Sequence, residues 1–443
     1  ATAGGNTGNV TIDNGTTALN LGAQTIAGSL TATSGNVAGI TDSGNVSVAG
    51  DVDLTTDAND GVINMGTLQQ STGDLLLTTD GTGNATVVNN QGIDFGTSNV
   101  GGDLAVTASA GTITQNGGAL DVGGTSSFTT SANDQVITLD NTGNALTGAV
   151  TFSTATAGGN TGNVTIDNGT TALNLGAQTI AGSLTATSGN ASGITDSGNV
   201  SVAGDVDLTT DANDGVINMG TLQQSAGDLL LTTDGTGNAT VVNNQGIDFG
   251  TSNVGGDLAV TASAGTITQD GGALTVDGTS SFTTSTADQA ITLNDTSNAL
   301  SGAASFTTTD GGGNSGDVTI DNGTTNLIFG ASNIFGSLTA TSGGTITQTG
   351  DLTVETAGTF TTDVDDQSIT LDNTSNAISG ALTFMTQSTS ANTGNVTIDN
   401  GTTAIDLAAS TIAGSLKATS GNAAGITDSG NISVAGDVDL TTD

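Results

Sequence analysis

The sequence predicts an all-β fold, a right-handed parallel β-helix (β-solenoid) of about 18 coils. Three observations point to this fold. Long blocks repeat along the chain, a shorter period of about 22 residues runs inside them, and apolar residues alternate at every second position. Alternation of this kind is typical of strands with one buried face. Units that stack only on their neighbours build a one-dimensional object, not a single active site.

The long repeat divides the chain into four units. Residues 1–154 return as residues 155–308 with 16 substitutions, a shortened third unit covers 309–386, and a partial fourth covers 387–443. We expect the four to form one continuous solenoid. Because the chain starts and stops inside a repeat, we also expect it to be a portion of something longer. One block, Gly-Asn-Val-Thr-Ile-Asp-Asn-Gly-Thr-Thr, recurs with a single substitution at 8–17, 162–171, 316–325 and 394–403.

The shorter period is marked by a glycine, any residue, an apolar residue, any residue and a second apolar residue. In the first unit these starts lie at Gly28, Gly50, Gly73, Gly102, Gly124 and Gly148, with intervals of 22, 23, 29, 22, 24 and 34 residues up to the next unit. Three short strands and three corners fit such a coil. In the coil from Gly102 we expect strands at 104–106, 112–114 and 119–122.

The two longer intervals are expected to hold longer strands or outward loops. Pairs of glycines are expected at corners that need a positive φ. Successive coils should lie about 4.8 Å apart, and the chirality of parallel crossovers predicts right-handed winding.

Composition agrees with strands and tight turns. The chain has no Pro, Trp or Tyr, one Lys, no Arg and 69 Gly among 443 residues, so it lacks most strong helix formers and the main interrupter of β ladders. We expect Val, Leu, Ile and Phe inside the coils and Asn, Thr and Asp outside. Two alternatives are disorder and a string of β-sandwiches. Recurring apolar alternation disfavours the first, and the lack of Trp or Tyr core anchors and of Pro-bearing turns disfavours the second.

Charge and missing residue types exclude several functions. The formal charge of −41 makes nucleic acid and anionic lipid poor partners, because both are bound through Lys and Arg. No apolar run is long enough to insert in a membrane. Without His or Cys, the chain has no imidazole base, thiol nucleophile or usual zinc site. We expect no enzyme activity and no required cofactor; Lys417, which replaces Thr31 of the first unit, is expected to face outward.

The pieces Gly-Asp-Leu-x-Val-Thr and Gly-Thr-Ile-Thr-Gln, clearest in 102–122 and 256–276, resemble repeats of filamentous haemagglutinin-like exoproteins. These are bacterial surface adhesins of the two-partner-secretion or autotransporter type. The resemblance implies a right-handed β-helix at the bacterial cell surface or outside the cell, acting as a rigid stalk or adhesive fibre. We expect its partners to be other copies of the chain, through self-association, or cell surfaces and glycans. A self-assembling homopolymeric filament or sheath is the alternative, because uncapped solenoid ends expose strand edges.

One set of acidic residues suggests a metal site. Each member follows the glycine that opens a coil, so that in register they would stack on consecutive rungs about 4.8 Å apart. Either the carboxylates turn into solvent and cap backbone amides, or Ca²⁺, which prefers carboxylate oxygens, bridges them; the segment 57–61 could add a ligand. The candidates are Asp51, Asp74 and Asp103 in the first unit and Asp205, Asp228 and Asp257 in the second.

Outward threonines suggest a distant alternative. Thr31 and Thr33, or Thr55 and Thr56, could contribute to a flat hydroxyl array such as an ice-binding solenoid presents. Thr also simply suits strands, and the irregular coil lengths are expected to break any long array.

Overall fold

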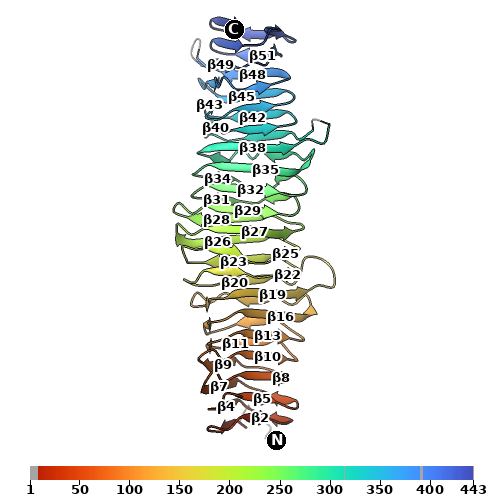
Figure 1. Cartoon of the computed structure of the whole chain (residues 1–443), viewed down its shortest axis with the longest axis vertical. Coiled ribbons are helices and arrows are strands. Elements are labelled where there is room, and N and C mark those ends of the chain that lie inside the picture. The colour runs from red at the N-terminus through yellow and green to blue at the C-terminus, as the bar shows by residue number, and fades with distance from the viewer. Residues whose placement is uncertain (1–7, 314, 390–392, 443) are drawn as a thin grey trace. The chain divides into compact units, whose positions relative to one another are not determined.

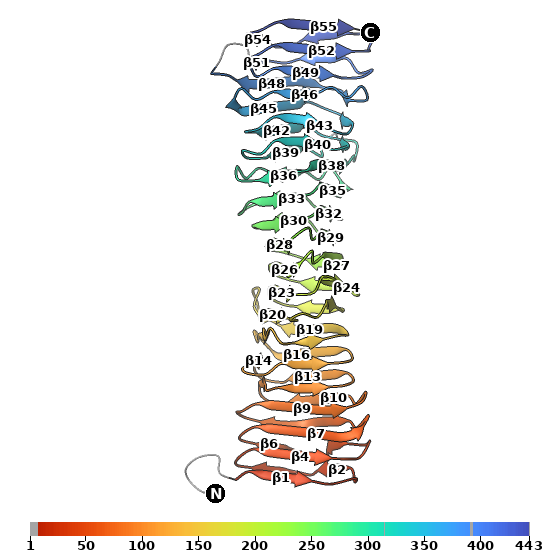
Figure 2. The ribbon, with the colours of Figure 1, turned by 90° about the vertical axis from the view of Figure 1, so that its left-hand side faces the viewer.

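The computed structural model describes residues 8–313, 315–389 and 393–442. It is all-β, and no residue in these ranges lies in a helix. The chain divides into unit 1, residues 1–227, and unit 2, residues 228–443. In each unit the strands stack as the parallel β-solenoid that the sequence predicts, and together the units hold about 20 turns. Figures 1 and 2 show the stacked strands.

Unit 1 begins with β1 (Val10–Asp13), β2 (Leu19–Leu21), β3 (Gln24–Ile26), β4 (Leu30–Ser34), β5 (Ile40–Asp42), β6 (Val46–Val48), β7 (Val52–Asn59), β8 (Ile63–Gln70) and β9 (Leu75–Asp80). They are followed by β10 (Ala85–Asn89), β11 (Ile93–Phe95), β12 (Ser98–Val100), β13 (Leu104–Ala108), β14 (Ile113–Gln115), β15 (Leu120–Val122), β16 (Ser126–Asn133), β17 (Ile137–Leu139), β18 (Ala145–Leu146) and β19 (Ala149–Ala155). Unit 1 ends with β20 (Val164–Asp167), β21 (Leu173–Leu175), β22 (Gln178–Ile180), β23 (Leu184–Ser188), β24 (Ile194–Asp196), β25 (Val200–Val202), β26 (Val206–Asn213) and β27 (Ile217–Gln224).

Unit 2 begins with β28 (Leu229–Asp234), β29 (Ala239–Asn243), β30 (Ile247–Phe249), β31 (Ser252–Val254), β32 (Leu258–Ala262), β33 (Ile267–Gln269), β34 (Leu274–Val276), β35 (Ser280–Ala287), β36 (Ile291–Leu293), β37 (Ala299–Leu300) and β38 (Ala303–Thr309). It continues with β39 (Val318–Asp321), β40 (Leu327–Phe329), β41 (Ser332–Ile334), β42 (Leu338–Ser342), β43 (Ile346–Gln348), β44 (Leu352–Val354), β45 (Gly358–Asp365), β46 (Ile369–Leu371), β47 (Ala377–Ile378) and β48 (Ala381–Gln387). Its last strands are β49 (Val396–Asp399), β50 (Ile405–Leu407), β51 (Ser410–Ile412), β52 (Leu416–Ser420), β53 (Ile426–Asp428), β54 (Ile432–Val434) and β55 (Val438–Thr442).

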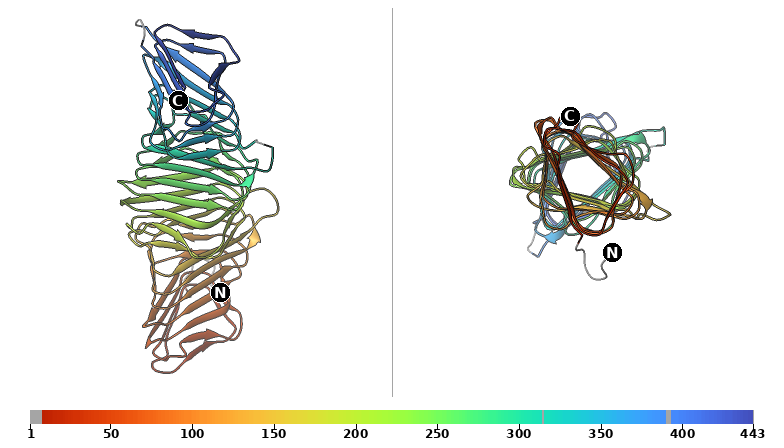
Figure 3. Two further views of the ribbon diagram at one scale, coloured as in Figure 1. Left: turned by 45° about the horizontal axis from the view of Figure 1, so that its top comes forward. Right: turned by 90° about the horizontal axis from the view of Figure 1, so that it is seen from below.

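Each coil has two halves that lie in different sheets. A single half contributes one strand, such as β13, and a double half contributes two short strands with a corner between them, such as β14 and β15. We call sheet A of unit 1 the one that contains β1, β14 and β15, and sheet B the one that contains β13. The coil from Gly102 thus has the three strands expected from its sequence. Seen end-on, the coils of unit 1 nearest the N-terminus trace a closed outline (Figure 3, right).

Apolar side chains fill the coils. In sheet A, Leu30 pairs in register with Val52, and Val52 with Leu75; all three are fully buried. Phe128 and Phe152 stack in unit 1 with ring centroids 5.7 Å apart, and Phe282 and Phe306 do so in unit 2 at 5.6 Å. Polar residues that alternate with the buried ones along each strand point outward, such as Thr31 after Leu30 and Asp53 after Val52. The expected apolar interior and polar exterior are therefore confirmed.

The coil count expected from the sequence is too low because two strand starts, at Gly83 and Gly162, are not among the coil starts given above, although both match the coil motif. The interval of 29 residues contains β10, which begins after Gly83-Asn84, and the interval of 34 residues contains β20, which begins after Gly162-Asn163. Each is an additional single half-coil. Extra chain was expected in longer strands or outward loops, and instead it adds half a turn each time. Residues 156–163 do also form the outward loop seen in gold in Figure 1.

An additional half-coil moves the double halves to the other sheet. We call such a place, where two single halves follow each other, a junction; β9–β10 and β19–β20 are the junctions of unit 1, and β28–β29, β38–β39 and β48–β49 are those of unit 2. From β10 to β19 the chain makes seven half-coils: β10, β11–β12, β13, β14–β15, β16, β17–β18 and β19. Because seven is odd, the next stretch begins on the opposite sheet, with β10 in sheet B and β20 in sheet A.

A buried asparagine completes the pairing at a junction. Above β18 of the double half, the chain returns as the single strand β20, which pairs with β17. The Leu146 N–H donates to Asn168 Oδ1 at 2.9 Å, and Asn168 Nδ2 donates to the Leu146 carbonyl at 3.1 Å. The side-chain amide thus replaces a neighbouring peptide group, and no buried backbone group at Leu146 is left unpaired.

The same device recurs at other junctions. At β9–β10, Asn89 Oδ1 accepts the Gln70 N–H at 2.8 Å and Asn89 Nδ2 donates to the Gln70 carbonyl at 3.0 Å. In unit 2, Asn322 pairs in this way with Leu300, and Asn400 with Ile378. All these asparagines are fully buried. One buried Asn therefore marks each of these changes of sheet.

Candidate functional site

The candidate calcium ligands all lie directly before a strand, at a coil corner. Asp51 precedes β7 and Asp74 precedes β9, which are neighbours in sheet A. Asp103 precedes β13, which lies in sheet B and stacks on β10. The expected row of three consecutive aspartates is therefore wrong: a junction separates Asp74 from Asp103. The structure brings together only Asp51 and Asp74 of the first three.

The second set is divided differently. Asp205 precedes β26 in unit 1, whereas Asp228 precedes β28 in unit 2. Asp257 precedes β32 in unit 2 and occupies the position that Asp103 has in unit 1.

Three of these corner carboxylates, Asp51, Asp103 and Asp257, cap backbone amides of the next coil. Asp51 Oδ1 accepts the Asp74 N–H at 3.0 Å. Asp103 Oδ1 accepts the Thr125 N–H at 2.7 Å and the Thr125 hydroxyl at 2.9 Å, and Asp257 makes the same two bonds to Thr279. Two arrangements were possible for these aspartates, capping of backbone amides or bridging by Ca²⁺. The geometry matches capping by solvent-facing side chains.

Asn and Ser make the same cap at other corners. Asn84 Oδ1 accepts the Asp103 N–H at 2.7 Å, and Ser29 Oγ accepts the Asp51 N–H at 3.1 Å. An amide or hydroxyl therefore serves where the aspartates do, which shows that the corner needs an oxygen acceptor and not a charge.

The capping oxygen explains the glycine of the coil motif. A Cβ at Gly102 would overlap Asn84 Oδ1, and a Cβ at Gly124 would overlap Asp103 Oδ1. Neither glycine has a positive φ, and nor do their partners in the pairs Gly101–Gly102 and Gly123–Gly124. The expectation of positive φ is therefore wrong at these two pairs, whereas Gly158 and Gly159 do have positive φ, of 150° and 84°. At Gly102 and Gly124 glycine is needed because the cap and the backbone of the coil below, such as the Thr82 carbonyl beneath Gly102, together occupy the space of a side chain.

Burial and neighbouring charges shift the pKa of one corner carboxyl, and hydrogen bonds shift that of another. Burial raises the pKa of the Asp74 carboxyl, and the charges of Asp94 and Asp51 raise it further. In the segment 57–61, Asp60 has a φ of 63°, and hydrogen bonds from the Thr82 N–H and hydroxyl lower its pKa. Within the described ranges no group of three or more His, Cys, Asp or Glu residues could hold a metal ion. Calcium binding stays a prediction.

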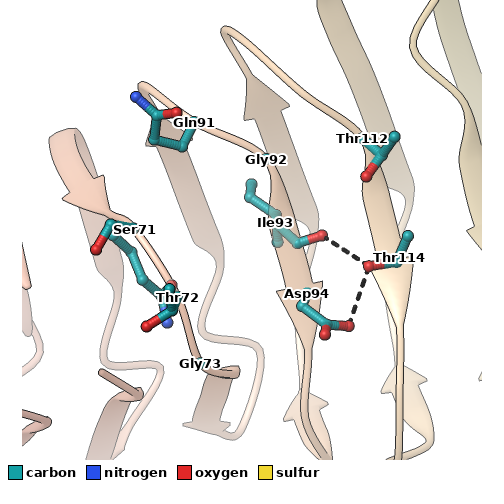
Figure 4. A pocket seen from close by; sticks show the side chains of 10 residues that line it. Ser71, Thr72, Gly73, Gln91, Gly92, Ile93, Asp94, Thr112 and Thr114 are labelled. Carbon is teal, nitrogen blue, oxygen red and sulfur yellow. Dashed lines mark hydrogen bonds between the residues drawn. The ribbon is translucent and has the colours of Figure 1, made fainter. Parts of the chain in front are cut away.

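A polar groove at the first junction was not expected from the sequence. It has a volume of about 260 Å³ and is lined by the end of β8 and the turn after it (residues 70–73), by residues 91–94 leading into β11, and by Thr112 and Thr114 at β14 (Figure 4). Asp94 Oδ1 accepts the Thr114 hydroxyl at 3.1 Å, and Asp94 Oδ2 accepts Asn116 Nδ2 at 2.5 Å. Hydroxyls, amides and one carboxylate line it, so it could receive a polar ligand. The signal that could have located it is the additional strand start at Gly83-Asn84.

Lys417 and the threonines Thr31, Thr33 and Thr55 lie on outward faces. Thr56 was expected outside with them, and this is wrong: it is buried, and its hydroxyl donates to the Gly61 carbonyl at 2.9 Å. Lys417 is exposed in β52, between Thr397 and Asp439 of the neighbouring strands. In unit 2, Thr319, Thr339, Thr359 and Thr383 form one row of four rungs. In unit 1 the corresponding row reads Thr31, Asp53, Leu76. Asp53 and Leu76, and not an irregular coil length, interrupt this row, whereas Thr33, Thr55 and Thr78 continue as a row of three rungs.

The chain belongs to a family of repeats of unknown function (DUF5649). The family model matches residues 7–78, 82–153, 161–232, 236–307, 315–384 and 393–443, which is most of the chain. The boundaries between these matches fall at the junctions, so one family repeat is one stretch of seven half-coils wherever two junctions enclose it. No curated protein and no solved structure matches the chain. Among the residues described, no helix is long and apolar enough to span a membrane.

Proposed function

We propose that this member of the DUF5649 repeat family is a structural segment of an extracellular bacterial surface fibre, acting as a rigid stalk or a cell-contact surface. The observation that carries the proposal is the continuity of the ladder inside each unit. Every coil is paired in parallel to the next, and at the junctions of unit 1 buried asparagines maintain the pairing where the sheets change roles.

A ladder of this kind favours a mechanical role. Its interior is a column of buried Leu, Val, Ile and Phe, and its backbone groups are bonded to the coils above and below. Breaking one rung exposes apolar surface and several backbone groups at once, each of which is costly to leave unpaired. Rigidity therefore follows from stacking alone, and it can be extended by adding repeats.

The surface suits exposure outside a cell. With one Lys and no Arg, the chain offers trypsin-like proteases a single sequence site. Its charge of −41 favours solubility and discourages nonspecific contact with anionic surfaces. The polar groove beside Asp94 supplies hydroxyl and amide groups of the kind that could bind a neutral glycan, which would support the contact role.

Localisation on the producing cell tests the proposal. Intact, non-permeabilised cells would be labelled with an antibody to residues 1–443 and imaged by immunogold electron microscopy. We expect label on surface fibres and its loss after digestion with a nonspecific protease. Label that appears only after permeabilisation would contradict the proposal. Beads coated with the full chain and passed over a glycan array would then separate a contact surface, which retains beads, from a bare stalk.

A further inference from the structure

The outward face of sheet B carries no charge over a long part of unit 1. From β10 to β22, no strand of this sheet contains an acidic or basic residue. Over the same coils sheet A contains Asp94, Asp121 and Asp167. The outward side chains of sheet B there are Thr86, Val88, Ala105, Thr107, Ser127, Thr129, Thr151, Ser153, Asn174 and Thr179, all half-buried or exposed.

Unit 2 repeats this neutral face. Its sheet B is the one that contains β29, and from β29 to β41 its strands contain no acidic or basic residue. The outward side chains there are Thr240, Val242, Ala259, Thr261, Ser281, Thr283, Ser305, Thr307, Ile328 and Asn333.

The nearest acids lie at the corners and are already bonded. Asp103 is bonded to Thr125. Asp134, beyond the end of β16, accepts hydrogen bonds from the Thr156 and Thr161 hydroxyls and from the Ala157 N–H. These carboxylates border the neutral face and do not interrupt it.

A neutral face is unusual on a chain with 42 acidic and one basic residue. Two copies that approach through acidic faces repel each other, and burying unpaired carboxylates costs free energy. Only a charge-free face lets two copies come into contact without that cost. The face has no carboxylate that could form an ion pair, so it gives no advantage to a basic partner.

We propose that sheet B in residues 85–180 and in residues 239–334 is a docking face for the same face of a second copy. Its Thr, Ser, Ala and Val side chains are small, so two sheets can pack face to face at about 10 Å. Hydroxyl and amide groups can pair across such an interface, and a self-complementary patch produces a symmetric pair. This inference is independent of where the chain is located or whether it binds glycans.

Sedimentation equilibrium of the full chain in low and high NaCl tests the proposal. We expect a dimer that strengthens with salt, because salt screens the remaining acidic faces. The double variant Ser127→Asp with Ser281→Asp places a charge on the face in both units. Like charges brought together across an interface should weaken the dimer by roughly a hundredfold. The matched control is Thr138→Asp with Thr292→Asp, in β17 and β36 of sheet A, which should leave the dimer unchanged.

Circular dichroism of each variant separates loss of pairing from loss of fold. A wild-type chain that remains monomeric at every concentration and salt level would overturn the proposal. So would equal weakening by the two double variants. If the sheet B variant left the dimer intact but abolished retention on a neutral polysaccharide column, the face would bind glycan and not a second copy, and the proposal would again be wrong.

Discussion

Regular coils and junctions of the same solenoid solve the pairing problem in different ways. In the regular coil from β13 to β15, each strand pairs with an equivalent strand above and below. At the junction above β18, one strand is replaced by the side chain of Asn168. In the regular coil a buried side chain only adds to the strand pairing, since Asn144 Oδ1 accepts the Leu120 N–H at 2.9 Å. At the junction side chains stand in for strand pairing: Asn168 at Leu146, and Gln178, whose Nε2 donates to the Val150 carbonyl at 2.7 Å. Substitutions should therefore be far more costly at junction asparagines than at corners.

Deletions give the largest contrast. Removing residues 103–124, one whole regular coil, places β16 on β10 and β18 on β12, so strand types still match. Removing residues 124–134 takes out only the single half β16, and a double half then follows a double half with no asparagine to complete the pairing. We expect the first variant to melt cooperatively close to the wild type and the second to lose cooperative melting.

Circular dichroism melting of both deletion variants is the measurement. Similar melting of the two would mean that the order of single and double halves does not matter.

Asn168→Leu should have the next largest effect. It leaves the Leu146 N–H and carbonyl unpaired in the interior, at a cost of roughly 2–4 kcal/mol. Hydrogen exchange of the Leu146 amide is the direct readout, and its protection should fall more than that of Val122 in the regular coil below. Asn99→Thr, an exposed change on β12, is the control and should alter stability by less than about 0.5 kcal/mol. Unchanged protection at Leu146 would show that Asn168 is dispensable.

Asp103→Ala tests a corner cap of the regular coils. It removes the acceptor for the Thr125 N–H and hydroxyl, both near solvent, so water can replace it. The free energy of unfolding should fall by about 1 kcal/mol, and Asp103→Asn should restore most of the loss. Urea unfolding of the variants measures this, with Asp121→Thr as the control, since the chain itself has Thr275 at that position. A loss as large as that of Asn168→Leu would remove the distinction between corners and junctions.

Chelation should have the smallest effect. The Asp51 carboxylate already accepts a hydrogen bond from the Asp74 backbone N–H, so it needs no cation as a partner. We therefore expect the same melting temperature with EDTA as with millimolar CaCl₂. A rise in melting temperature with calcium, abolished by Asp51→Asn, would instead establish the bridging cation that the sequence allows.

The regular coils could be predicted from the sequence, and the junctions could not. Local alternation locates strands correctly, as at 104–106 and 119–122, because inward and outward residues differ in polarity. The pattern does not tell on which strand a strand will stack, so it does not identify β10 and β20 as additional half-coils and wrongly predicts that Asp103 stacks on Asp74. Asn168 was visible in the repeated block, but its role depends on Leu146, a partner one coil away. The polar groove beside Asp94 was missed for the same reason.

Disulfide mapping across the first junction tests the half-turn arrangement most directly. The chain has no Cys, and β10 should stack on β8 with Thr86 beside Asn64. In-register parallel strands bring such residues within disulfide reach. The double variant Asn64→Cys with Thr86→Cys should therefore oxidise to an intramolecular disulfide as readily as Thr86→Cys with Ala105→Cys, a pair from the next rung. If only the second pair formed a disulfide, residues 83–90 would not stack on β8, and the half-turn arrangement would be contradicted.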